Sequence, residues 1–166
     1  MLPYLLYALF GLLFGVLDWY YLDALAFMNW GDLGDNPLVV PIIVALNLGI
    51  WLVPIVPAAL YETRRAASLR RAALVGALVW CCAVLGYYAW YAALLLFSGL
   101  PHMDHLLYSN RFDPAYGEYW RDALRTILLN QVLEWLPVAL LVGALSGWIT
   151  GWLYLRRRPP HLTLDT

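Results

Sequence analysis

Residues 132–155 read VLEWLPVALLVGALSGWITGWLYL, and Glu134 is the single charged side chain in this stretch. About 20 apolar residues in a helix cross the hydrocarbon core of a bilayer, because a helix satisfies its backbone polar groups internally. Three arginines and two prolines follow at 156–160, where the cations suit a helix end and the prolines prevent its continuation. These residues therefore predict a transmembrane helix.

Three more stretches meet the same requirement: residues 2–22, 38–61 and 72–100. The composition agrees, since 63% of the 166 residues are hydrophobic and 13% are charged, whereas a soluble domain is about half apolar and about a quarter charged. A soluble monomer, a disordered chain and a disulfide-stapled module are excluded on this basis. The fold class we expect is an all-α integral membrane protein, with one domain over 1–166 and four transmembrane helices.

The positions of the arginines predict the orientation of these helices. Seven of the ten basic residues lie between the second and third spans or in the tail over 156–166: Arg64, Arg65, Arg70, Arg71, Arg156, Arg157 and Arg158. The other side has Arg111, Arg121 and Arg125. Because basic residues concentrate in cytoplasmic loops, we expect a multi-pass protein of the cell membrane with both termini in the cytoplasm. An even number of spans leaves both termini on the same side of the membrane, which agrees with this prediction.

The loop between the third and fourth spans contains a further predicted helix, at about 114–129. Asp113-Pro114 offers a helix cap and a first-turn proline. Apolar residues then recur at helical spacing, while charged residues such as Glu118 and Arg121 occupy the opposite face. This pattern predicts an amphipathic helix on the outer membrane surface, where it serves as an anchor or as a lid or docking face.

Small residues recur at four-residue spacing in two of the spans. They are Gly11 and Gly15 in the first, and Ala139, Gly143, Gly147 and Gly151 in the fourth. Helices in lipid associate through close backbone approach, because hydrophobicity gains them nothing there. We therefore expect another helix to cover one face of the fourth span, either the first span of the same chain or a second polypeptide.

The second span has the sequence of a kinked helix. Pro41, Pro54 and Pro57 remove backbone donors, which is tolerated where protein or water satisfies the freed carbonyls. Asn47 lies between them and is a candidate interhelical or ligand contact. Four deep aromatic residues could line the same internal surface: Trp51, Trp80, Tyr87 and Tyr88.

Two carboxylates, Asp18 and Glu134, lie within the apolar spans near the outer boundary. Ionisable residues inside a membrane are costly and mark functional sites by default. Two interpretations stay open here. One is solvation at the interface, and the other is a paired acid site in which one ionised and one protonated carboxyl activate water.

One cluster has metal-ligand chemistry, formed by His102, Asp104 and His105 in the outer loop. Two imidazoles and a carboxylate suit a transition metal. The three lie within four residues of an exposed loop and have no fourth ligand nearby, so we expect a solvated loop with no metal and no cofactor. No histidine lies in a span, and no phosphate-binding loop, serine-hydrolase or zinc-protease motif occurs, which excludes a transmembrane bis-histidine haem and the commonest enzyme classes.

These observations favour a non-catalytic accessory or structural subunit of a larger membrane complex, docked through the small-residue helix faces. A small transport or lipophilic-ligand-binding protein is the alternative, with the kinked span and the deep aromatic residues around its cavity. A membrane enzyme with an outer-face carboxylate or metal site is the third hypothesis. The expected partners are membrane lipid and other integral membrane subunits, since loop arginines suit anionic headgroups rather than nucleic acid.

Overall fold

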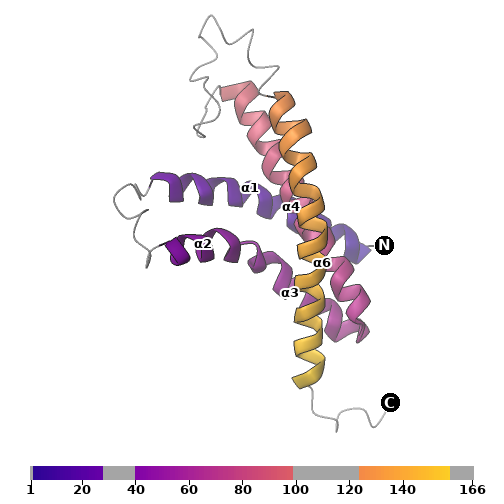
Figure 1. Ribbon diagram of the computed structural model, residues 1–166. Coiled ribbons are helices and arrows are strands. Elements are labelled where there is room, and N and C mark those ends of the chain that lie inside the picture. The colour runs from indigo at the N-terminus through magenta and orange to yellow at the C-terminus, as the bar shows by residue number, and fades with distance from the viewer. Residues whose placement is uncertain (1, 28–39, 99–123, 158–166) are drawn as a thin grey trace, which may run out of the picture.

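The computed structural model describes residues 2–27, 40–98 and 124–157, and every element within them is a helix. The elements are α1 (Leu2–Phe27), α2 (Val40–Gly49), α3 (Leu52–Ala66), α4 (Leu69–Ser98), the π-helix η1 (Thr126–Gln131) and α6 (Val132–Arg157) (Figure 1). Within these residues, three stretches are long and apolar enough to cross a membrane: Pro3–Leu22, Leu69–Leu94 and Leu129–Arg157. To this extent the expectation of an all-α membrane protein is confirmed.

Helix α4 is central, and both α1 and α6 pack against it. Residues of α4, taken from its start onward, contact Gly151, then Gly147 and then Gly143 of α6, so the two helices are antiparallel. Along α4, Val79 contacts Gly11 of α1 and the later residue Ala83 contacts Gly15, so α1 and α4 run in the same general direction. Figure 1 shows α6 beside α4, with α1 crossing this pair and extending to one side of it.

The small residues of α6 lie where its backbone meets the backbone of α4. A Cβ atom at Gly147 would overlap the carbonyl oxygen of Ala72, and one at Gly143 would lie 2.8 Å from the carbonyl oxygen of Gly76. The other two members of the stripe are buried on the same side of the helix. The helix that covers this face is therefore α4, the third predicted span, and not the first span or a second polypeptide.

Gly11 and Gly15 allow the same close approach between α1 and α4. A Cβ atom at either position would overlap a carbonyl oxygen of α4, that of Val79 or that of Ala83. Gly86 contributes from α4, since a Cβ atom there would overlap a carbonyl oxygen of α1. Hydrocarbon gives two apolar helices no drive to associate, so close van der Waals contact holds α1 against α4.

The predicted span over 38–61 is not one continuous helix. Helices α2 and α3 replace it, and Trp51 lies in the break between them. The break follows from Pro54, which has no N–H to offer the carbonyl of Ile50 four positions earlier. The Val53 N–H donates to that carbonyl instead, at 3.0 Å, in a tighter turn than that of an α-helix.

A short turn joins α3 to α4. Ala67 has a left-handed backbone with a φ of 45°, and its N–H donates to the Thr63 carbonyl at 2.9 Å, which closes α3. Ser68 then caps α4, because its Oγ accepts a hydrogen bond from the Arg71 N–H at 3.4 Å. The turn brings the end of α3 and the start of α4 together, and with them Glu62 and Arg71.

Several predicted features lie outside the described residues. The metal candidates His102, Asp104 and His105 are among them, as is most of the predicted surface helix over 114–129. Of that helix the structure describes the part from Leu124 onward, where two α-helical residues lead into η1 and then α6.

Candidate functional site

One face of α1 is turned toward the other helices. Its buried members recur at helical spacing: Tyr7, Gly11, Gly15, Asp18 and Trp19. Because Gly15 meets α4 near Ala83, Asp18 lies about one turn further along α1, opposite the next turn of α4. The sequence of α1 therefore places a carboxyl group between two apolar helices.

The Asp18 carboxyl has no hydrogen-bond partner in the part of the chain that the structure describes. The residue is 1% exposed, and within residues 2–27, 40–98 and 124–157 neither of its oxygens makes a hydrogen bond. Burying a polar group without a hydrogen bond costs about 2–7 kcal/mol, and an isolated charge costs far more. Such a residue inside an apolar span is a functional candidate, because stability alone would favour its replacement.

Aromatic side chains of α1 and α4 line this part of the interface. The rings of Trp19 and Tyr91 have centroids 6.4 Å apart, and those of Tyr20 and Trp90 are 6.2 Å apart. Among the described residues, the buried Tyr91 hydroxyl and the buried Trp90 indole N–H have no hydrogen-bond partner. Among the described residues, the α1–α4 interface therefore includes a buried carboxyl without a donor and buried donors without an acceptor.

A second aromatic group lies nearer the start of α4. The break between α2 and α3 places Trp51 against Trp80, with stacked rings 5.5 Å apart. The Trp80 indole N–H is buried and makes no hydrogen bond within the described part of the chain. Tyr87 and Tyr88 are buried in the same core and meet edge to face at 5.0 Å. Three of the four deep aromatic residues singled out in the sequence thus belong to the core, and Trp51 packs against it.

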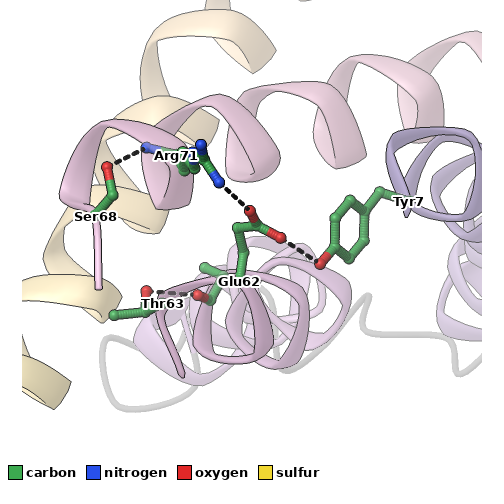
Figure 2. A network of polar contacts seen from close by, with 6 residues as sticks. Tyr7, Glu62, Thr63, Ser68 and Arg71 are labelled. Atoms are coloured by element: carbon green, nitrogen blue, oxygen red, sulfur yellow. Dashed lines mark hydrogen bonds and ion pairs between the residues drawn. The ribbon is translucent and has the colours of Figure 1, made fainter. Parts of the chain in front are cut away.

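A second buried carboxyl lies at the other end of these helices. Glu62 of α3 is 2% exposed and accepts a hydrogen bond at 3.0 Å from the Tyr7 hydroxyl of α1. Arg71 of α4 places its Nη1 3.9 Å from the Oε1 of Glu62, so the carboxylate joins three helices (Figure 2). Unlike the Asp18 carboxyl, the buried Glu62 carboxylate has a hydrogen-bond donor and a cation beside it.

Sequence reasoning missed this cluster. Glu62 stands at the edge of an arginine-rich loop, which suggests a solvated residue, and its partner Tyr7 is 55 residues away. The signal available in the sequence was a charged residue directly after the predicted span, at a position that a longer helix would include. It indicates a carboxylate on the helix, but it does not identify the hydroxyl that binds it.

Within the described residues, the structure does not bring Asp18 and Glu134 together as a hydrogen-bonded acid pair. Glu134 is exposed near the start of α6, whereas Asp18 is buried and makes no hydrogen bond to it. Asn47 lies in α2, and its side chain is outside the described part of the structure. Within the described residues, no group of three or more His, Cys, Asp or Glu side chains could hold a metal ion.

Comparison with protein-family models, curated proteins and solved structures gave no match for this chain. A function therefore has to follow from its own geometry. Among the described residues, the buried side-chain atoms without a hydrogen bond are the two Asp18 carboxyl oxygens, the indole nitrogens of Trp80 and Trp90 and the Tyr91 hydroxyl oxygen.

Proposed function

We propose that this chain is a small ligand-binding protein of the cell membrane, and that it binds a lipophilic organic cation at Asp18. The supporting observation is the buried Asp18 carboxyl, whose oxygens have no hydrogen-bond partner among the described residues. A cation supplies the missing partner, since opposite charges attract strongly in surroundings of low dielectric constant. The sequence also suggested a ligand-binding protein, but with the ligand beside the kinked second span and the deep aromatic residues and not at Asp18.

The aromatic side chains indicate the chemistry of the ligand. A cation over the face of a Trp or Tyr ring gains about 2 kcal/mol or more when it is desolvated, and the same rings accommodate apolar substituents. A small metal cation requires about six or more oxygen ligands in place of its water shell, and one carboxylate with indole and phenol groups does not provide them. An organic cation with apolar groups fits this set of side chains better.

We further propose that the chain crosses the membrane four times. Helices α2 and α3 run opposite to α1, because the Tyr21 hydroxyl donates to the Leu46 carbonyl at 3.3 Å near one end and Tyr7 donates to Glu62 near the other. From residue 7 to residue 21, α1 rises about 21 Å, which is most of the roughly 30 Å hydrocarbon core. The broken pair α2–α3 therefore supports the fourth crossing.

We propose that the chain is oriented in the membrane with both termini in the cytoplasm. Six described arginines gather at one end of the helices, at the end of α3, the start of α4 and the end of α6. Two of them lie over aromatic rings there, Arg64 at 5.5 Å from the Tyr154 ring and Arg156 at 5.2 Å from the Trp152 ring. Basic residues favour the cytoplasmic side, and amphipathic rings favour the membrane boundary.

An accessory subunit, the function that the sequence favoured, has less support. Its docking face was the small-residue stripe of α6, and α4 of the same chain covers that face. A partner helix would have to bind apolar side chains that α1 and α6 expose, such as Leu17 and Leu141. Purification in mild detergent tests this second hypothesis, since a subunit would bring a partner protein with it in fixed stoichiometry.

Equilibrium dialysis of tetraphenylphosphonium against the purified protein tests the proposed cation site. We expect saturable binding, with at least a tenfold loss of affinity in Asp18→Asn, which keeps the side-chain shape and removes the charge. Glu134→Gln is the matched control because it removes an exposed carboxylate, and it should lower the affinity much less than Asp18→Asn does. Equal affinity in Asp18→Asn, or no saturable binding by folded wild-type protein, would overturn the proposal.

A further inference from the structure

A shallow apolar groove lies along α4 between α1 and α6, apart from the Asp18 site. Its volume is about 430 Å³, and it is open along one side. It is lined by Tyr4 of α1, by Leu74, Ala77, Leu78 and Cys81 of α4, and by Leu140 of α6. Its surface is almost entirely apolar, so a ligand that fits it has a hydrocarbon part.

The groove begins next to the basic end of the helices. Arg70 precedes Leu74 by four residues and Arg71 precedes it by three, so both lie one turn before the groove on its own side of α4. Arg71 contacts Glu62, yet its side chain is still 57% exposed. Among the described residues, this end carries six arginines and the buried carboxylate of Glu62, so its exposed charge is positive.

We infer that the groove binds an acyl chain of an anionic phospholipid whose phosphate lies against Arg70 and Arg71. Methylene groups suit the apolar lining, and arginines at a membrane surface attract anionic headgroups. From Arg70 to Cys81, α4 rises about 16 Å, which is close to half of the roughly 30 Å hydrocarbon core. The distance from the arginines to the far end of the groove therefore matches the depth of one leaflet.

A second helix fits this groove less well than a lipid chain. From Leu74 to Cys81 the groove follows α4 for about 10.5 Å, and a helix about 10 Å in diameter occupies about 820 Å³ over that length, roughly twice the 430 Å³ of the groove. An apolar helix also offers no negative charge to the arginines at its end. The size of the groove and the charge beside it therefore favour a phospholipid over a protein partner.

Native mass spectrometry tests this inference on protein taken from mixed bilayers of phosphatidylglycerol and phosphatidylcholine and then washed with detergent. Wild type should retain phosphatidylglycerol in preference to phosphatidylcholine. Arg70→Gln should lower that retention about fivefold, the factor for one basic side chain at an anionic surface. Arg125→Gln removes an exposed arginine outside the basic end and should retain lipid as wild type does.

A second pair of variants tests the groove itself. Leu140→Trp adds a large ring to the groove lining and should displace the retained lipid. Leu141→Trp adds the same ring at an exposed neighbouring position that does not line the groove, and it should leave retention unchanged. Equal retention of both phospholipids by wild type, or unchanged retention in both Arg70→Gln and Leu140→Trp, would overturn the inference. Tetraphenylphosphonium binding, measured on the same preparations, tests the proposed cation site at Asp18 separately from the groove.

Discussion

Replacement of Gly147 by Leu should force α6 away from α4 and destabilise the chain. A Cβ atom at this position would overlap the carbonyl oxygen of Ala72. It would also lie 3.1 Å from the Ala72 carbonyl carbon and 3.2 Å from the Cα atom of Gly76. All three are backbone atoms of α4, so no side-chain rotation relieves the overlap and the helices have to separate.

The size of the effect follows from these contacts. Ordinary Cβ contacts begin at 3.4 Å, so even the two longer contacts require shifts of 0.3 and 0.2 Å before the rest of the Leu side chain is placed. A gap of about 0.5–1 Å forfeits a quarter to a half of the van der Waals attraction along the contact. Overpacking costs about 1–3 kcal/mol, and we expect the upper end because the obstruction is backbone. Helix propensity returns about 1 kcal/mol, which leaves a loss of about 2 kcal/mol.

Reversible unfolding in mixed micelles, followed by circular dichroism, measures this change in the free energy of unfolding. Leu145→Ala is one control, because Leu145 is 55% exposed and the change should stay within about 0.5 kcal/mol. Gly49→Ala is another, because no atom lies within 4 Å of the Cβ that it would add. A Gly147→Leu protein as stable as wild type would refute the packing of α6 on α4 through this face.

Two further predictions concern the Glu62 cluster and the topology. Tyr7→Phe removes the hydrogen bond to the buried Glu62 carboxylate and should cost about 1–3 kcal/mol in the same assay. Tyr4→Phe changes an exposed side chain and should cost little, so equal stability of the two variants would contradict a stabilising role for the bond. Reporter fusions after Thr166 should report the cytoplasm and fusions near Asp35 the outside, and the reverse result at either position would refute the four-span orientation.

Hydropathy predicted the long helices from the sequence because a bilayer constrains every residue of a span. The last helix illustrates this, since its predicted bounds of 132–155 lie within two residues of the observed Val132–Arg157. Local signals mark its end, where cations and prolines follow the apolar run. The small-residue stripe likewise indicated which face of this helix would be covered.

Features that depend on the tertiary arrangement were not predictable in the same way. Three prolines predicted a kink in the second span, but only the structure shows that Pro54 breaks the helix at Trp51. The small residues of the fourth span indicated a face that another helix covers, yet they did not identify that helix as α4. The contact between Tyr7 and a carboxylate 55 residues away has no local signal at all.

The most direct test of the central claim is whether a bound cation contacts the surroundings of Asp18. A photoreactive azidophenyl phosphonium cation can be irradiated on the purified protein, and its adducts mapped by mass spectrometry. We predict adducts on the segments that contain Trp19 or Tyr91, suppressed by excess tetraphenylphosphonium and reduced in Asp18→Asn. Adducts confined to exposed positions such as Leu141, and insensitive to the competitor, would contradict a cation site at Asp18.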